Sequence, residues 1–317
     1  MNVVIVGQGA IGLLFYNFIN KNKQSKDSLT LRPSYSLPIK NNKTFYQFTD
    51  INGVTSTQSL AYADNNAVKN ADIIIFTVKS YQVKQAIADI EHLIPSQSTV
   101  ILCHNGMGTV DELPSTFTLS QPMLAMLTTH GCLKPSPLNI IHTGLGQVDF
   151  GVIGNKSFLD NITDKNTLKL TQRSIQQLTP LLTPAIFHKN ISEKQWLKLA
   201  INCVINPLTA LYDMNNSGVL EQSFSQKCQD ILQEVVLVAE TQNVMLELEI
   251  LIDTVKGVAQ ATSKNSSSMR CDITSNKPTE IDYINGFIHR LGQKYNIPTP
   301  ENSLLWKKIT HLSNSSQ

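Results

Sequence analysis

The sequence has no excess of charge of either sign and no long apolar run. Its 26 lysine and arginine residues nearly balance its 24 aspartate and glutamate residues, which gives a formal net charge of +2 at pH 7. A nearly neutral chain gives no electrostatic reason to predict a nucleic-acid or membrane partner. No apolar run approaches the roughly 18 residues that a transmembrane helix needs. We therefore expect neither nucleic acid nor a membrane among the partners.

Cysteine is scarce and shows no disulfide or metal-binding pattern. The five cysteines are odd in number and widely spaced, and none forms a C-x-x-C pair. This usage predicts reduced thiols, a cytoplasmic protein and no metal site. After Met1 there is no basic segment or small-residue cleavage site of the kind that secretory signal peptides carry. With 317 residues, the chain is long enough for two domains of ordinary size.

The first twenty residues carry a dinucleotide-binding pattern. Val3–Val6 is a continuous β-branched run, as in a buried parallel strand, and helical spacing begins at Leu13. Between them lies a G-x-G-x-x-G motif, which consists of Gly7, Gln8, Gly9, Ala10, Ile11 and Gly12. The first glycine permits the tight turn, the second lets a pyrophosphate approach the backbone, and the third allows close packing of helix on strand.

The end of the second predicted strand, Ser28–Leu31, indicates which dinucleotide is bound. A site that prefers NAD usually places an acidic residue here to hold the ribose 2′-hydroxyl. This chain has Arg32 instead, and a guanidinium suits a 2′-phosphate. We therefore predict NADP(H) rather than NAD(H). The alternative is a surface arginine that begins a loop.

Two later apolar runs, Ala71–Val78 and Thr99–Cys103, predict further buried strands. The carboxyl ends of strands in such sheets face the ligand crevice. Lys79 follows the first run and Asn105 follows the second, so both are candidates for cofactor contacts. The alternatives are a solvated lysine that opens the next helix and an ordinary Asn-Gly turn.

Further strands without obvious chemistry are predicted in the first half of the chain. Residues 35–66 are rich in Asn, Thr, Ser and Gln, which predicts short strands or loops. A strand is also predicted at Met123–Thr128, followed by a hairpin with arms at Asn139–His142 and Gln147–Val152. His130 and His142 belong to no triad or metal-ligand spacing, so we expect both to be structural.

One predicted helix carries a polar stripe on an otherwise apolar surface. Within Trp196–Pro207 the polar residues are Lys198, Asn202 and Asn206, at i, i+4 and i+8, so they share one helix face. A helix that is apolar on its other faces is usually buried, and a lysine buried with it is a candidate acid or base. The alternative is a surface stripe on a partly exposed helix.

Strand patterns end near residue 189, and the rest of the chain predicts helices. Helical periodicity also covers four later segments, Gln222–Thr241, Leu246–Ser263, Glu280–Tyr295 and Glu301–Leu312. The predicted fold is therefore α/β. It has a Rossmann-type dinucleotide-binding domain over residues 1–189 and an all-helical substrate and catalytic domain over residues 190–317.

Six motifs occur along the chain in an order that characterises one protein family. They are GQGAIG at Gly7–Gly12, TVKS around Lys79, HNGMG at His104–Gly108, KLAINCVINPLTAL at Lys198–Leu211, NSSSM at Asn265–Met269 and TEIDYINGF at Thr279–Phe287. Together they resemble the ketopantoate reductase (2-dehydropantoate 2-reductase) family, of the 6-phosphogluconate-dehydrogenase-like group. The joint match of the last three motifs with a dinucleotide fold is highly specific.

The resemblance implies a set of cofactor and substrate positions. The matching cofactor-binding positions are Gly7–Gly12, Arg32, Lys79, Asn105, Gly131 and Glu280. The matching substrate-binding positions are Asn105, Lys198, Asn202, Asn206, Asn216 and Ser268. Among these, Lys198 matches the catalytic general acid.

The resemblance also implies a reaction, the NADPH-dependent reduction of ketopantoate to pantoate on the way to pantothenate and coenzyme A. Such a reduction needs a hydride, which the cofactor supplies, and a proton, which Lys198 can supply. Asn202 and Asn206 can bind the hydroxyl that distinguishes this substrate from plain 2-oxo acids, and Ser268 can bind the carboxylate. Glu280 can keep the lysine protonated, or it can be an acid at a helix N-terminus.

Two other functions stay open on the sequence alone. One is a reductase of the same fold that acts on another small 2-oxo acid, and the other is a non-catalytic NADP(H)-sensing protein. The asparagine pair favours a hydroxylated substrate, and a buried lysine counts against a sensor. The sequence does not distinguish a monomer from a homodimer.

Overall fold

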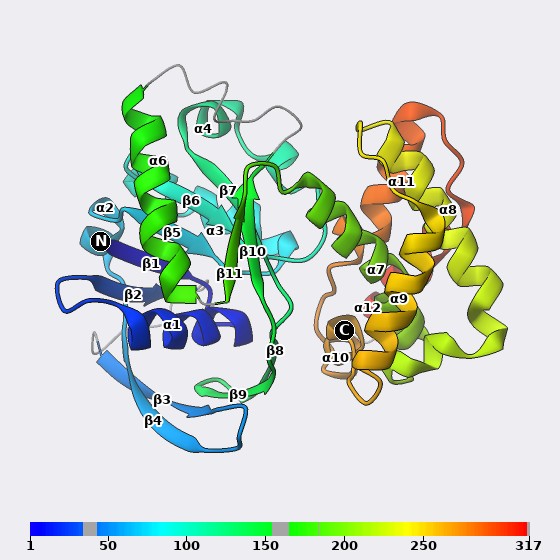
Figure 1. The fold of residues 1–317 in the computed structure, drawn as a ribbon, viewed down its shortest axis with the longest axis horizontal. Helices are drawn as coiled ribbons and strands as arrows, with labels where there is room; N and C mark the ends of the chain where they lie inside the picture. Colours follow the sequence, from blue (N-terminus) through cyan, green and yellow to red (C-terminus); the bar gives the residue numbers. More distant parts are fainter. Residues whose placement is uncertain (34–42, 154–164, 183, 316–317) are drawn as a thin grey trace. The chain divides into compact units, whose positions relative to one another are not determined.

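The chain forms two compact units, an α/β unit and a helical unit. The computed structural model describes residues 1–33, 43–153, 165–182 and 184–315 (Figure 1). The α/β unit contains Met1–His104 and Val110–Ile191, and the helical unit contains Asn105–Thr109 and Ser192–Gln317. The predicted fold class, a Rossmann-type α/β domain followed by a helical domain, is confirmed. Within the described residues, no helix has the length and apolarity to cross a membrane.

The α/β unit is built on a mostly parallel seven-stranded sheet in the order β11-β10-β7-β6-β5-β1-β2. Only the pairing of β10 with β7 is antiparallel. The strands are β1 (Asn2–Val6), β2 (Ser28–Arg32), β5 (Ile73–Phe76), β6 (Thr99–Leu102), β7 (Met123–Thr128), β10 (Val148–Val152) and β11 (Ala185–His188). The central strands β1, β5 and β6 are almost wholly buried, which is why their sequences are continuous apolar runs.

Alternate residues of these strands feed two cores on opposite faces of the sheet. Val3 and Ile5 join the core that contains residues of α1 (Ala10–Asn22) and α6 (Lys165–Leu178). Val4 and Val6 join the other core, on the side of three shorter helices. These are α2 (Asn65–Lys69), α3 (Val83–Ala88) and α4 (Ser115–Ser120). The period of two along each strand therefore anchors helices on both faces.

A second sheet, in the order β4-β3-β9-β8, covers the other side of α1 (Figure 1). Its strands are β3 (Lys43–Thr49), β4 (Thr55–Ala61), β8 (Gly131–Ser136) and β9 (Asn139–Gly144). Of the polar stretch 35–66, residues 35–42 lie outside the described part of the chain. The rest supplies β3, β4 and α2, and Tyr46 and Phe48 of β3 complete the core around α1.

The predicted hairpin between residues 139 and 152 is wrong, because its two arms belong to different sheets. β9 pairs with β8 and β3, whereas β10 pairs with β7 and β11. An alternating pattern identifies a strand but does not identify the strand beside it. The true partner, β8, has no apolar pattern because it is a largely exposed edge strand, and it contains Pro135, which only edge positions tolerate.

His130 and His142 form a buried pair beside Phe18 of α1. His130 Nδ1 lies 3.1 Å from His142 Nε2 and also accepts a hydrogen bond of 3.1 Å from the Gly146 backbone N–H. As an acceptor, Nδ1 of His130 carries no proton, so this ring is neutral with its hydrogen on Nε2. Burial lowers the pKa of both imidazoles below the ordinary value of 6.5.

The histidine pair predicts acid destabilisation of the second sheet. Below pH 6.5 these histidines bind protons in the unfolded chain but stay neutral in the folded one. The free energy of unfolding is therefore highest at neutral pH and decreases as the pH falls below 6.5. Hydrogen-exchange protection of β8 and β9, corrected for intrinsic rates, should therefore fall between pH 7 and pH 5. His142→Gln should make this fall shallower, whereas the exposed His92→Gln should not. Equal pH profiles for all three proteins would contradict the prediction.

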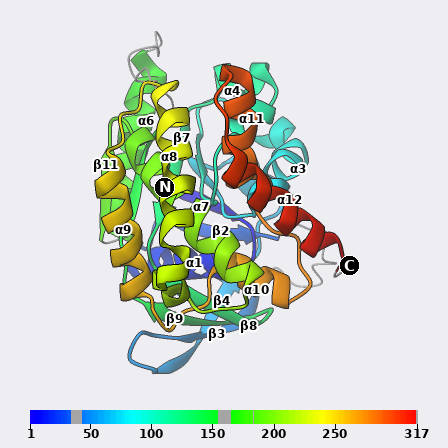
Figure 2. The same ribbon diagram turned by 90° about the vertical axis from the view of Figure 1, so that its right-hand side faces the viewer.

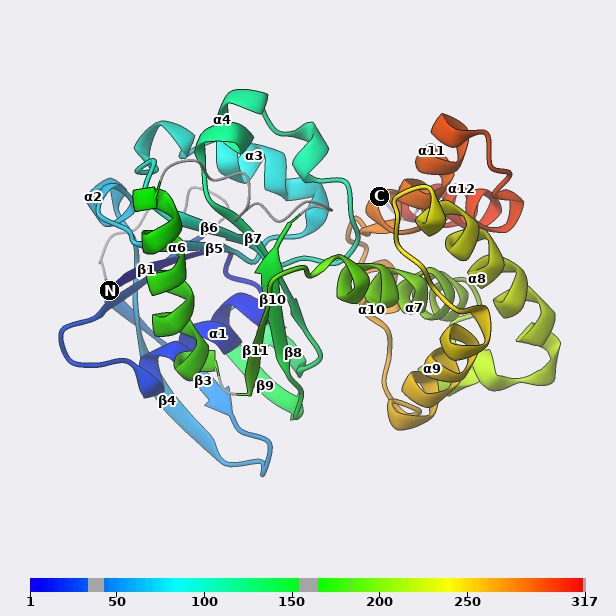
Figure 3. The same cartoon turned by 45° about the horizontal axis from the view of Figure 1, so that its top comes forward.

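The helical unit is arranged around α7 (Ser192–Leu211), against which the other helices of the unit pack (Figures 2 and 3). The helices besides α7 are α8 (Ser225–Glu240), α9 (Leu248–Ala261), α10 (Ser268–Thr274), α11 (Asn285–Tyr295) and α12 (Pro300–Ser315). Short 3₁₀ turns, η5 (Asn216–Leu220), η6 (Gln222–Phe224) and η7 (Ile281–Tyr283), connect them. Their apolar faces form one core, with Trp196 of α7 among its largest fully buried side chains.

A buried polar network repairs a break in the hydrogen bonding of α7. Pro207 lies inside the helix and has no N–H to donate to the carbonyl four residues earlier, that of Cys203. Asn285 Nδ2 donates to this carbonyl at 3.0 Å and to Asn302 Oδ1 at 2.9 Å. Asn302 in turn donates to Glu234, whose carboxylate also accepts from the backbone N–H groups at the start of α12. The network thus joins α7, α8, α11 and α12.

Coupling between Asn285 and Pro207 tests this repair. Asn285→Ala should lower the free energy of unfolding by about 2 kcal/mol, because it leaves buried acceptors unpaired. In a Pro207→Ala background the loss should shrink by about 1 kcal/mol, since the alanine N–H can donate to the Cys203 carbonyl. Both tryptophans, Trp196 and Trp306, lie in the helical unit, so urea unfolding followed by tryptophan fluorescence measures the effect there. Strictly additive losses would contradict the repair.

Candidate functional site

The glycine motif forms a tight turn between β1 and α1. Gly7 has φ +117°, and its backbone N–H donates to the carbonyl of Arg32 at 2.8 Å. A Cβ on Gly12 would lie 2.0 Å from the Gly7 carbonyl oxygen, so only glycine permits this approach of helix to strand. Thr77, just after β5, secures the turn by donating its hydroxyl to the carbonyls of Val6 and Gly7.

Gly9 adjoins an open position, as the close approach of a pyrophosphate requires. A Cβ on Gly9 would meet only the Thr77 carbonyl oxygen, at 3.8 Å, so none of the described residues fills this position. Gly9 is also the residue before α1, which has no side-chain cap and no acidic residue in its first turn. The N–H groups and the positive dipole end of this helix therefore face the open space, as binding of an anion requires.

The other predicted cofactor residues of the α/β unit also lie at or beyond strand ends. Arg32 is the last residue of β2, is half-buried, and donates from Nη1 to Asn65 Oδ1 at 3.1 Å. Lys79 follows β5 and directly precedes η1 (Ser80–Gln82), as its alternative interpretation expected, but it is only partly exposed. Gly131 is the first residue of β8, beyond the end of β7.

Two residues that the sequence did not single out contact the glycine turn. The Tyr62 hydroxyl donates to Gln8 Oε1 at 3.4 Å, and Lys134 Nζ donates to the Gln8 carbonyl oxygen at 3.0 Å. Both come from the second sheet or its edge, and no motif or spacing in the sequence connects them to residue 8.

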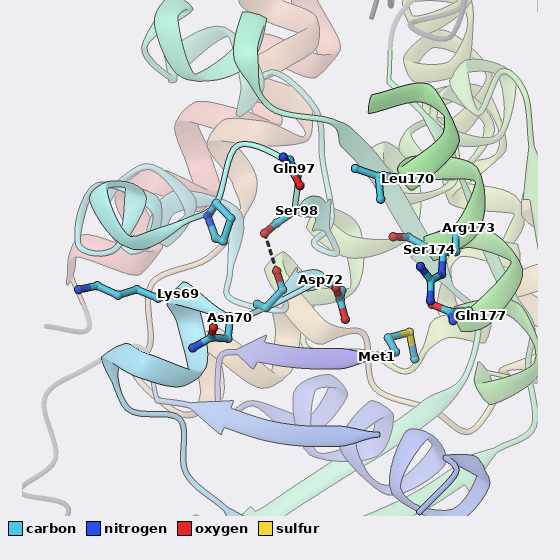
Figure 4. A pocket seen from close by; sticks show the side chains of 12 residues that line it. Met1, Lys69, Asn70, Asp72, Gln97, Ser98, Leu170, Arg173, Ser174 and Gln177 are labelled. Atoms are coloured by element: carbon cyan, nitrogen blue, oxygen red, sulfur yellow. Dashed lines mark hydrogen bonds between the residues drawn. The ribbon is translucent and has the colours of Figure 1, made fainter. Parts of the chain in front are cut away.

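A cavity of about 240 Å³ in the α/β unit lies at the amino ends of the strands of the main sheet (Figure 4). Its lining includes Met1, Asp72 and Ser98, which directly precede β1, β5 and β6. Ligands of open α/β sheets bind at the carboxyl ends of the strands, so this cavity is not the dinucleotide site.

In the helical unit, the polar stripe of α7 is partly buried. Asn206 is 6% exposed, and Lys198 and Asn202 are half-buried. Asn202 Nδ2 is buried and has no hydrogen-bond partner among the described residues. A buried donor left unpaired costs stability, so its retention on this face indicates a position for a polar ligand.

Asn216 and Ser268 present polar groups from two further elements. Asn216, at the start of η5, donates from Nδ2 to Thr262 Oγ1 at 3.0 Å, while its buried Oδ1 has no partner within the described chain. Ser268 is exposed at the first position of α10. The preceding residue, Ser267, is structural, because its hydroxyl caps α10 and accepts a hydrogen bond from Thr209 of α7.

Glu280 is a buried carboxylate bound by Asn105. The Asn105 backbone N–H lies 3.3 Å from Oε1, and its Nδ2 lies 3.0 Å from Oε2. Glu280 is 4% exposed and makes no side-chain capping bond to η7, the 3₁₀ turn that follows it. The predicted helix from Glu280 to Tyr295 is therefore wrong at its start, since α11 begins only at Asn285, after an irregular Ile284.

The loop 105–109 belongs to the helical unit because its glycines fit closely against η7 and α11. Gly106 has φ +81°, and a Cβ there would lie 2.2 Å from the Tyr283 carbonyl oxygen. Gly108 has φ +93° and lies against the ring of Phe287. The Met107 N–H donates to the same Tyr283 carbonyl at 2.8 Å. HNGMG and TEIDYINGF, far apart in sequence, thus build one structure.

Comparison with known families identifies the family of this chain. Residues 3–155 match the family described as Ketopantoate reductase PanE/ApbA, and residues 190–313 match its C-terminal domain. A 2-dehydropantoate 2-reductase of Vibrio cholerae is 31% identical, over 99% of both chains. The chain belongs to the ketopantoate reductase family. A relative of the same name from Escherichia coli O157:H7 is also 31% identical, over 98% of this chain and 94% of that one.

Solved structures share the fold of this family member. A PanE/ApbA family ketopantoate reductase from Ralstonia eutropha JMP134 superposes with a TM-score of 0.82, at 22% identity and full coverage of both chains. D-mandelate dehydrogenase, solved with NADH and anilino(oxo)acetate, gives a TM-score of 0.84 at 22% identity over 100% of this chain and 99% of that one. A dimeric ketopantoate reductase from Staphylococcus aureus gives 0.80 at 20% identity over both full chains.

The close fit of the 105–109 loop can be tested by comparing two glycines of positive φ. Gly106→Ala should lower stability by about 2 kcal/mol or more, because it adds a backbone clash to the strain of a positive φ. Gly53→Ala is the matched control: φ is +83° and nothing lies within 4 Å of its Cβ, so only the strain of about 1 kcal/mol applies. Thermal unfolding followed by circular dichroism compares the two, and equal losses would contradict the clash.

Proposed function

We propose that the protein reduces ketopantoate (2-dehydropantoate) to (R)-pantoate with NADPH, a step in the synthesis of pantothenate and coenzyme A. The observation that carries the proposal is the α7 stripe, in which Lys198 and two asparagines share a partly buried helix face. Membership of the ketopantoate reductase family and full-length similarity to proteins named 2-dehydropantoate 2-reductase support the same activity.

The cofactor in this proposal is NADPH, which the α/β unit holds. Residues 1–189 form the cofactor-binding domain. Gly7–Gly12 binds the pyrophosphate, and Arg32 binds the 2′-phosphate with its guanidinium. Lys79 and Gly131 complete the contacts of this unit, and Asn105 and Glu280 contribute from the other. The bound nicotinamide supplies the hydride for the substrate carbonyl carbon.

Lys198 is the general acid of the proposed reaction. As the hydride adds to the carbonyl carbon, negative charge develops on the carbonyl oxygen, and the ammonium stabilises that charge and then transfers a proton to it. The domain formed by residues 190–317 thus carries the acid. We assign the buried Glu280 to keeping Lys198 protonated, because a carboxylate beside a lysine favours the charged form that a general acid needs.

The unpaired amide groups of Asn202 and Asn216 support a hydroxylated substrate. Nδ2 of Asn202 is a donor and Oδ1 of Asn216 is an acceptor, and η5 packs against α7. A hydroxyl can accept from the first and donate to the second, which a plain aliphatic 2-oxo acid cannot do. We assign Asn202, Asn206 and Asn216 to the hydroxyl end of ketopantoate, and Ser268 and Asn105 to the carboxylate and carbonyl region.

The proposed setting is the cytoplasm, where thiols stay reduced. None of the five cysteines, all within the described residues, forms a disulfide, which a reducing compartment accommodates. The partner is a small-molecule substrate, and the protein acts as a monomer or homodimer. No cluster of His, Cys, Asp and Glu able to hold a metal ion occurs in the described residues, and the proposed chemistry calls for none.

Lys198→Ala tests the role of the general acid. It should lower kcat at least about 100-fold, as loss of general acid catalysis usually does, while changing the Kd for NADPH little. The decrease in NADPH absorbance gives kcat. Quenching of protein fluorescence, or titration calorimetry, gives the Kd for NADPH. Lys194→Ala, an exposed lysine one turn earlier on α7, is the matched control and should retain activity. Near-normal kcat for Lys198→Ala would rule out this role.

A substrate panel separates ketopantoate from other 2-oxo acids. Ketopantoate should be reduced much faster than pyruvate or 2-oxoisovalerate, and Asn202→Ala should narrow that difference by lowering kcat/KM for ketopantoate alone. Preference for another 2-oxo acid would keep the mechanism and change the substrate. NADPH binding without turnover of any of them would favour a non-catalytic sensor.

A further inference from the structure

Strand β8 directs two side chains toward the glycine turn. Cys132 and Lys134 are two residues apart, so they extend from the same face of the strand. Cys132 Sγ lies 3.5 Å from the Ala10 carbonyl oxygen, and Lys134 Nζ lies 3.0 Å from the Gln8 carbonyl oxygen. The second sheet therefore contributes to the wall of the site that the G-x-G-x-x-G motif begins.

The ammonium of Lys134 is held where negative charge is expected to bind. Gln8 stands between Gly7 and Gly9, immediately before the N-terminus of α1, where this fold places a pyrophosphate. Gln8 itself is 7% exposed, whereas Lys134 is exposed, so the lysine side chain reaches from solvent to the rim of the turn. The Gln8 carbonyl accepts from the ammonium, so this contact positions the positive charge beside the turn.

Arg32 approaches the same turn from another element. It ends β2, its carbonyl accepts the Gly7 N–H, and its guanidinium is bound to Asn65 at the start of α2. Lys134 belongs to β8, in the other sheet of this unit. The two cations are thus fixed by separate scaffolds, and only Arg32 could be identified from the order of residues along the chain.

We propose that Lys134 is a binding residue for the pyrophosphate of the dinucleotide, separate from Arg32, which serves the 2′-phosphate. The inference rests on the proposed NADPH cofactor. Lys134 then contributes to affinity for phosphorylated and unphosphorylated dinucleotides alike, whereas Arg32 sets the preference between them. The second sheet acquires a role in cofactor binding beyond covering α1.

Titration calorimetry can test the separate roles of Lys134 and Arg32 with two ligands, one that carries only the pyrophosphate and one that carries only the 2′-phosphate. ADP-ribose has the pyrophosphate and no 2′-phosphate, and 2′-AMP has the reverse. Lys134→Ala should weaken ADP-ribose, NADH and NADPH by a similar factor, about three- to tenfold for one partly screened charge contact, and leave 2′-AMP unchanged. Arg32→Ala should weaken NADPH and 2′-AMP and leave ADP-ribose unchanged. Lys134→Arg should retain most of the affinity.

Lys69→Ala is the matched control, because it removes an exposed lysine from the cavity at the amino ends of the strands, away from the glycine turn. It should bind every ligand as the wild type does, and circular dichroism should show all variants folded. Unchanged ADP-ribose binding in Lys134→Ala, or a loss confined to 2′-phosphorylated ligands, would overturn the inference while the proposed function stands. Failure of the wild-type protein to bind NADPH would instead overturn the proposed function.

Discussion

The hydrogen bond from Asn285 to the Cys203 carbonyl is the interaction on which the helical unit depends. Pro207 has no N–H, so the Cys203 carbonyl lacks its usual hydrogen-bond donor within α7. Asn285 supplies a replacement and binds Asn302 with its second amide hydrogen. The result fixes the path of α7 on both sides of the break, and α7 carries the polar stripe. A proline inside this helix is tolerable because a residue 78 positions beyond it completes the hydrogen bonding.

The α/β unit depends on close approaches of a different kind. Gly7 and Gly12 bring β1 and α1 into backbone contact, and Thr77 ties β5 to the same turn. These contacts leave an unfilled position above Gly9 at the positive end of a helix. The proposed anion site is therefore formed mainly by backbone and needs few charged side chains. Arg32 and Lys134 are the two charges that we propose for its rim.

The sequence predicted the strands and helices that have a strong periodicity, but it did not predict which elements lie beside one another. β1, β5, β6 and β7 are continuous apolar runs because both of their faces are buried, and the runs predicted them directly. β8 is an exposed edge strand, so it has no such pattern, and β9 was assigned to the wrong partner. The polar stretch before residue 66 gave no sign that Tyr46 and Phe48 complete a core. Pairing depends on packing between distant segments, which local periodicity does not encode.

The sequence by itself determined the glycine turn, the buried central strands and the shared face of Lys198, Asn202 and Asn206, because each follows from the pattern of one local segment. Only the tertiary structure decided that Glu280 binds Asn105 rather than capping a helix. It also decided that Asn202 and Asn216 each keep a buried polar atom with no hydrogen-bond partner among the described residues. Those facts depend on which atoms meet across elements, and burial removes the water that would otherwise satisfy them.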